Sequence, residues 1–122
     1  LRYGKACMGY KITKNQIDSG YIDQALLTLQ ESLEVFQEFK YDLGISCCYL
    51  EISQVLGSKK QYEEALVNIR KALEIYKENL GENHNQTCAC YEAIGTVLGD
   101  QGRYDDAFIG YGKALAIRMK IF

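Results

Sequence analysis

Cysteine and histidine are the residue types in this 122-residue sequence that could bind a metal ion or act as a nucleophile or base. The five cysteines are Cys7, Cys47, Cys48, Cys88 and Cys90. Neighbours among them are adjacent or one residue apart, which does not match the wider spacing of structural zinc ligands. The only histidine, His84, lies in a polar segment with no cysteine or carboxylate in helical register. We therefore expect buried packing cysteines, a loop or capping histidine, and no metal site.

Catalytic patterns are missing as well. No nucleophile, general base and orienting acid can be assembled from the sequence. It also contains neither GxxxxGKS nor GxGxxG, the glycine-rich patterns whose backbone amides bind phosphate groups. We predict that the chain is not an enzyme and that it uses no cofactor.

The charge balance narrows the class of partner. There are 14 Lys and Arg residues against 16 Asp and Glu, a formal net charge of −2. Nucleic acids and anionic membranes attract proteins with a basic surplus, which this sequence lacks. No apolar run approaches the ~18 residues that could span a bilayer. We expect neither nucleic acid nor a membrane as a partner, and the odd number of cysteines without a targeting segment predicts a cytoplasmic protein.

The elements that position these residues are predicted to be helices. The sequence has no proline, a residue that interrupts helices and marks irregular loops. Three eleven-residue segments beginning at Ala25, Ala65 and Ala107 share one pattern: ALLTLQESLEV, ALVNIRKALEI and AFIGYGKALAI. Their apolar residues recur with the period of an amphipathic helix, and a second helical pattern precedes each segment. We predict helices over roughly 3–18, 21–39, 42–57, 61–80, 86–100 and 103–121.

Turn chemistry agrees with these boundaries. Gly102 can adopt the left-handed conformation that ends a helix, and Asn85 is the predicted N-cap of the helix that follows the segment LGENHNQ. Gly95 is predicted to allow close packing between helices.

The repeated residues resemble the tetratricopeptide repeat, in which large and small residues alternate so that helix pairs interlock. The last repeat matches at Tyr91, Ile94, Gly95, Leu98, Gly102, Tyr104, Ala107, Tyr111 and Ala114. The middle repeat matches at Tyr49, Ile52, Leu56, Tyr62, Ala65, Ile69 and Ala72, and the first at Ile12, Gly20, Ile22, Ala25, Leu29 and Ser32. The spacing and the segment LGENHNQT are similar to the longer repeats of kinesin light chains, with Asn85 where those usually have proline. The resemblance implies an all-α solenoid, a right-handed superhelix of three antiparallel helix pairs. It forms a single domain over 1–122, with repeats of about 3–40, 42–80 and 86–121.

In this family the first helix of each pair lines a concave groove that binds protein segments. The resemblance therefore implies a non-catalytic interaction module with a protein or peptide ligand. The candidate contact residues are Tyr10, Lys11, Lys14, Leu50, Glu51, Gln54, Glu92 and Thr96. Lys11 and Lys14 make one end of the groove basic, while Glu51, Glu92 and Asp100 make the remainder acidic, so a bipolar partner segment is our hypothesis.

Two established uses of such grooves find no match in the sequence. A carboxylate clamp needs Lys, Asn and Arg donors from successive repeats. Its positions correspond to Tyr10, Lys14, Glu51, Ala89 and Ala93, of which only Lys14 is cationic. The asparagine ladder of kinesin light chains is replaced by Glu92 and Ala93. A chaperone tail is therefore not the expected ligand.

Two other interpretations stay open. The groove charges are also typical of a solvated helix face. In addition, the apolar residues Ile117 and Ile121 leave the last helix without a polar cap, which favours a structural spacer or a homo-oligomer formed through that helix.

Overall fold

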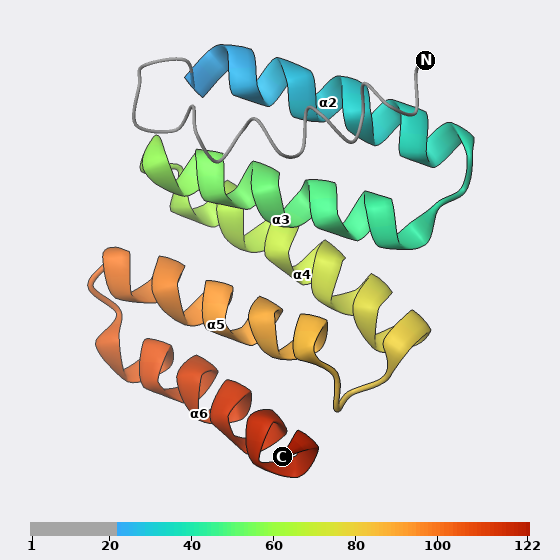
Figure 1. Cartoon of the computed structure of the whole chain (residues 1–122). Coiled ribbons are helices and arrows are strands. Elements are labelled where there is room, and N and C mark those ends of the chain that lie inside the picture. The colour runs from blue at the N-terminus through green and yellow to red at the C-terminus, as the bar shows by residue number, and fades with distance from the viewer. Residues whose placement is uncertain (1–21) are drawn as a thin grey trace.

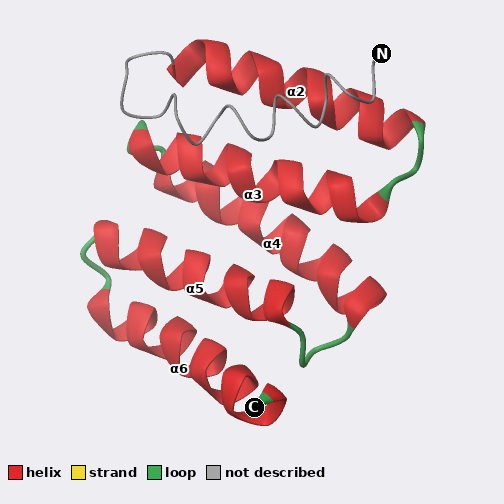
Figure 2. Ribbon diagram, viewed as in Figure 1, coloured by secondary structure: helices red, strands yellow, loops and turns green. Residues whose placement is uncertain are grey.

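The computed structural model describes residues 22–122, in which five α-helices follow one another (Figure 1). They are α2 (Ile22–Glu38), α3 (Asp42–Ser58), α4 (Tyr62–Leu80), α5 (Asn85–Asp100) and α6 (Tyr104–Ile121). This range contains no strand (Figure 2). The helix predicted over 3–18 lies outside the described residues. The other five predicted helices are confirmed, each to within one residue at both ends.

The helices stack in chain order, and each packs against the next (Figure 1). The turns between α2 and α3, α3 and α4, and α5 and α6 are short, so each helix runs back along its predecessor. The first helices α3 and α5 also contact each other directly, which places them together on one side of the stack. The described part of the chain is therefore an all-α solenoid of antiparallel helix pairs.

The three short turns share one backbone geometry. Each has a residue with positive φ at the same place: Lys40 (53°), Lys60 (63°) and Gly102 (83°). The following amide then donates to a carbonyl five residues earlier, as from Arg103 to Leu98 at 2.8 Å. This pattern satisfies carbonyl groups that the end of a helix would leave without a partner. The left-handed conformation predicted for Gly102 is confirmed.

The longer turn between α4 and α5 is fastened by side chains. The hydroxyl of the buried Thr87 donates to the Gly81 carbonyl at 2.8 Å. Glu82 accepts a hydrogen bond from the Tyr91 hydroxyl at 3.2 Å and lies 3.3 Å from the Lys77 ammonium. These contacts hold a turn that contains no regular secondary structure of its own.

The N-cap of α5 corrects one prediction. His84, not Asn85, has extended backbone angles, and its Nδ1 accepts a hydrogen bond from the Gln86 amide at 3.1 Å. Asn85 is already the first helical residue. The capping role predicted for the histidine is confirmed, because a ring nitrogen can satisfy a free amide of the first turn much as a short polar side chain does.

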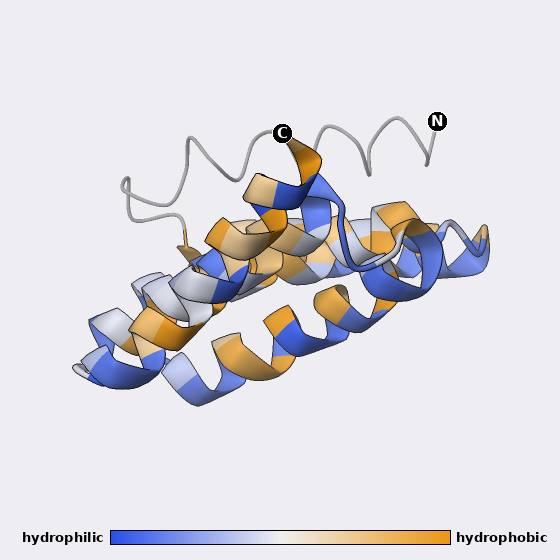
Figure 3. Ribbon diagram, turned by 90° about the horizontal axis from the view of Figure 1, so that it is seen from below, coloured by the Kyte–Doolittle hydropathy of each residue, from blue (hydrophilic) through white to orange (hydrophobic). Residues whose placement is uncertain are grey.

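Small residues set the spacing between the helices. Ala25, Ala65 and Ala107, which begin the three repeated segments, are all buried. α4 lies between α3 and α5 and buries the side chains of Leu66, Ile69, Ala72 and Tyr76. Hydrophobic and hydrophilic residues alternate along the helices, as amphipathic packing requires (Figure 3). None of the helices within residues 22–122 is both long and apolar enough to cross a membrane.

Candidate functional site

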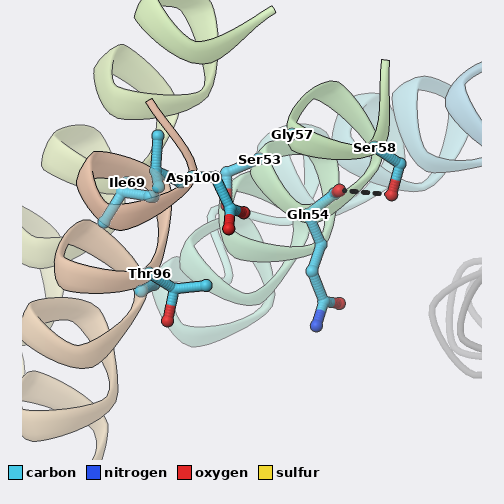
Figure 4. A pocket seen from close by; sticks show the side chains of 9 residues that line it. Ser53, Gln54, Gly57, Ser58, Ile69, Thr96 and Asp100 are labelled. Carbon is cyan, nitrogen blue, oxygen red and sulfur yellow. Dashed lines mark hydrogen bonds between the residues drawn. The ribbon is translucent and has the colours of Figure 1, made fainter. Parts of the chain in front are cut away.

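A pocket of about 310 Å3 opens between the first helices α3 and α5. Its lining residues are Ser53, Gln54, Gly57 and Ser58 of α3, Ile69 of α4, and Ala93, Thr96, Val97 and Asp100 of α5 (Figure 4). Two of the residues predicted as groove contacts, Gln54 and Thr96, lie here, and both are exposed. The pocket therefore joins two successive repeats on the side where their first helices meet.

The hydroxyl groups around the pocket donate their hydrogens to the backbone. Ser53 Oγ donates to the Leu50 carbonyl at 2.5 Å, and Ser58 Oγ donates to the Gln54 carbonyl at 3.2 Å (Figure 4). A hydroxyl oxygen in this arrangement keeps lone pairs with which it can accept a further hydrogen bond. The pocket thus offers hydrogen-bond acceptors.

Thr96 is engaged in the same way. Its hydroxyl donates to the Glu92 carbonyl at 3.0 Å, and it lies 3.0 Å from the Tyr111 hydroxyl of α6. Because the hydrogen of Thr96 is used toward Glu92, Tyr111 is the donor in the second contact. This link holds the exposed threonine in place relative to α6.

The electrostatic environment of the pocket is negative. Asp100 is exposed, and its carboxylate points from α5 into the space beside Ser53 (Figure 4). It makes no ion pair with any residue in 22–122, and no Lys, Arg or His side chain lines the pocket. α3 ends at Ser58 and α5 ends at Asp100, so the negative ends of two helix dipoles lie at the pocket as well.

The remaining predicted contact residues lie elsewhere. Tyr10, Lys11 and Lys14 are outside the described residues. Leu50 is half-buried against the core. Glu51 is only 6% exposed, which corrects the expectation that its carboxylate faces a partner across the groove.

Glu92 is the other acid whose expected role changes. Its carboxylate forms an ion pair with the Arg118 guanidinium of α6, and Oε1 lies 3.6 Å from the Cys88 sulfur. Its charge is therefore neutralised within the molecule. Sequence patterns along one helix could not show this, because the partner lies on the following helix.

Ser53, Gly57 and Asp100 complete the pocket, although the sequence did not predict them as contacts. A helical signal for them exists, because 50, 53, 54 and 57 follow the spacing of one helix face, as do 93, 96, 97 and 100. Following that face to the end of each first helix would have identified them.

The cysteines pack inside the helix pairs. Cys48, Cys88 and Cys90 are buried, as predicted, whereas Cys47 is half-buried. Cys47 Sγ lies 3.0 Å from the Tyr76 hydroxyl, and Cys88 Sγ donates to the Ala114 carbonyl at 3.2 Å. Within the described range no three His, Cys, Asp or Glu side chains are grouped so that they could hold a metal ion.

Burial of these thiols predicts a loss of stability in alkaline solution. Burial raises the pKa of Cys90 from 9.0 to about 12, so above pH 9 the unfolded chain ionises before the native one. Stability is therefore complete below about pH 9 and is lost as the pH rises toward 12, by up to about 1.4 kcal/mol per pH unit for this group. Urea unfolding at a series of pH values measures the slope. Cys90→Ala should flatten it, and an unchanged slope in that variant would contradict the assignment.

The comparisons with known proteins agree on the architecture. The family model of the tetratricopeptide repeat matches residues 44–120. The TPR domain of Arabidopsis FLU superimposes with a TM-score of 0.83 at 18% identity and covers 100% of both chains. BtubC (BKLC) from P. vanneervenii has a TM-score of 0.82 at 18% identity and covers 94% of this chain, which spans 46% of BtubC. No curated protein matches the sequence.

Proposed function

The chain belongs to the tetratricopeptide repeat family, and from this premise we propose that it is a non-catalytic interaction module whose groove binds a segment of a partner protein. Proteins of this fold generally mediate protein–protein interactions. The observation that carries the proposal here is the open pocket between α3 and α5, where exposed side chains of two repeats converge.

The chemistry of the pocket supports a donor-rich or basic partner segment. Asp100 supplies a carboxylate, Ser53 and Ser58 supply hydroxyl oxygens, and the ends of α3 and α5 add partial negative charge. A Lys or Arg side chain provides several N–H donors and a positive charge that complements this set. The apolar floor at Ile69 and Val97 can receive the methylene groups of such a side chain.

The bipolar hypothesis changes in one respect. The basic part of the partner is assigned to Asp100, since Glu51 is buried and Glu92 is paired with Arg118. The acidic part, opposite Lys11 and Lys14, stays a prediction from the sequence.

A peptide-binding measurement tests the role of Asp100. The probe is a labelled 12-residue peptide of alternating lysine and alanine, with a glutamate peptide of the same design as its counterpart. We expect the lysine peptide to bind more tightly, and Asp100→Asn to weaken its binding about three- to tenfold through the loss of a partly desolvated charge. Fluorescence anisotropy at low and moderate salt gives both affinities.

Glu78→Gln is the matched control, because Glu78 is an exposed acid of α4 that does not line the pocket. It removes the same charge and should leave binding within about twofold of the unaltered chain. Equal losses in the two variants would mean that only net charge attracts the peptide. Thr96→Trp, which places a large ring at the pocket, should weaken both peptides if the groove is the binding surface.

A further inference from the structure

The last helix presents a line of exposed apolar side chains. Ala107, Gly110, Ala114 and Ile117 form its buried side, against α5. On another side, the exposed apolar residues are Tyr104, Phe108, Tyr111, Leu115, Met119 and, just after the helix, Phe122. Their spacing of three or four residues places them along one face of α6. A line of this length at the end of the helical stack is an interaction surface.

The internal repeat shows what kind of element covers such a face. The equivalent residues of α4 lie 42 positions earlier, and there they are buried or half-buried because α4 lies between α3 and α5. Leu66 is 1% exposed, whereas its equivalent Phe108 is 76% exposed. The same positions that hold α5 against α4 are thus open on α6. The surface fits a helix that runs antiparallel to α6.

Polar contacts repeat in the same register. At the start of α2, Asp23 pairs with Lys59 at 3.2 Å, and at the start of α4, Glu63 accepts from Gln101 at 3.0 Å. In both, the donor comes from the end of the following antiparallel first helix. Asp105 occupies the equivalent place on α6, is exposed, and makes no ion pair with a described residue. A helix that covers α6 should therefore bring a donor at its C-terminal end.

We propose that the occupant is α6 of a second copy of this chain, packed antiparallel across a two-fold axis near Gly112. α6 is acidic in its first turn and basic in its last, so antiparallel pairing brings Asp105 of each copy opposite Lys120 of the other. The apolar line is also self-complementary, because Tyr104 meets Phe122 and Tyr111 meets Leu115. A two-fold interface requires this reciprocity. The surface lies on a different helix from the pocket, so the two sites are independent.

Sedimentation velocity of the 122-residue chain from about 1 to 200 μM tests the pairing, since a self-associating protein changes mass with concentration. We expect a monomer–dimer equilibrium. Phe108→Glu should weaken it at least about tenfold, because a carboxylate would be buried in the centre of the interface. Val67→Glu, at an exposed apolar position of α4, is the matched control and should leave it unchanged.

Charge reversal tests the orientation. Lys120→Asp alone should weaken the dimer, because it opposes two acids twice in the symmetric pair, and adding Asp105→Lys should restore it. Asp100→Asn, which affects the pocket, should not change the dimer. A chain that stays monomeric over the whole range, or a dimer that is insensitive to both Phe108→Glu and Lys120→Asp, overturns the proposal.

Discussion

Gly110→Leu is expected to separate α6 from α5 and to remove the cooperative folding of the last helix pair. A Cβ atom at Gly110 would lie 3.2 Å from the Gly95 amide nitrogen and 3.2 Å from the Tyr91 carbonyl oxygen. These are backbone atoms of a packed helix, so they cannot move aside as a flexible side chain would. A leucine here must push the two helices apart along their length.

The expected loss is large relative to the whole stability of the domain. Overpacking a core with a side chain costs about 1–3 kcal/mol where neighbours can adjust, and we expect at least the upper value because backbone blocks the space. A domain of this size is stable by only about 5–15 kcal/mol. Urea unfolding followed by circular dichroism should show a lower midpoint and a reduced slope, since α6 would no longer unfold with the rest.

Gly112→Ala provides the matched control on the same helix. No atom lies within 4 Å of a Cβ built at Gly112. Alanine has the higher helix propensity, so this change should stabilise the chain by up to about 1 kcal/mol. Similar unfolding midpoints for Gly110→Leu and Gly112→Ala would show that the close approach of α5 and α6 is not required.

Ile69→Ala is expected to have the second largest effect. Ile69 is fully buried (0% exposed) in α4, between α3 and α5, and it also forms the floor of the pocket. Removing its side chain leaves a cavity that two neighbouring helices must fill, with a cost of about 2–5 kcal/mol. The midpoint of urea unfolding should fall accordingly, with the slope unchanged.

The contrast with Val67 checks that burial, rather than helix propensity, causes this effect. Val67 lies two residues earlier on the same helix and is 48% exposed. Val67→Ala should change the free energy of unfolding by less than about 0.5 kcal/mol. If Ile69→Ala destabilises the chain no more than Val67→Ala does, the core does not depend on the contact of α4 with its two neighbours.

Much of the helical architecture could be predicted because its causes are local. Apolar residues at helical spacing fix which side of each helix is buried, and turn residues fix where it ends. The five described helices therefore begin and end where the pattern predicts. The error at Asn85 has a local cause too, because either of two neighbouring polar residues could cap α5 and the backbone places His84 there.

The candidate site could be predicted only in part. The helix period correctly grouped Gln54 and Thr96 on the first helices, and both line the pocket. The period could not show that Glu51 is buried or that Glu92 pairs with Arg118, because both outcomes depend on neighbouring elements. The contribution of Ile69 to the pocket floor likewise comes from the packing of a third helix.

By itself, then, the sequence determined the helices, their order and the repeated small residues that let them stack, since each of these follows from interactions between residues close in the chain. Only the tertiary structure decided which charges stay available. Asp100 is open at a pocket, Glu92 is neutralised from α6, and the apolar face that α4 buries is exposed on α6. The physical reason is that a side chain's charge and exposure depend on what packs against it, and in a solenoid that neighbour comes from the adjoining repeat.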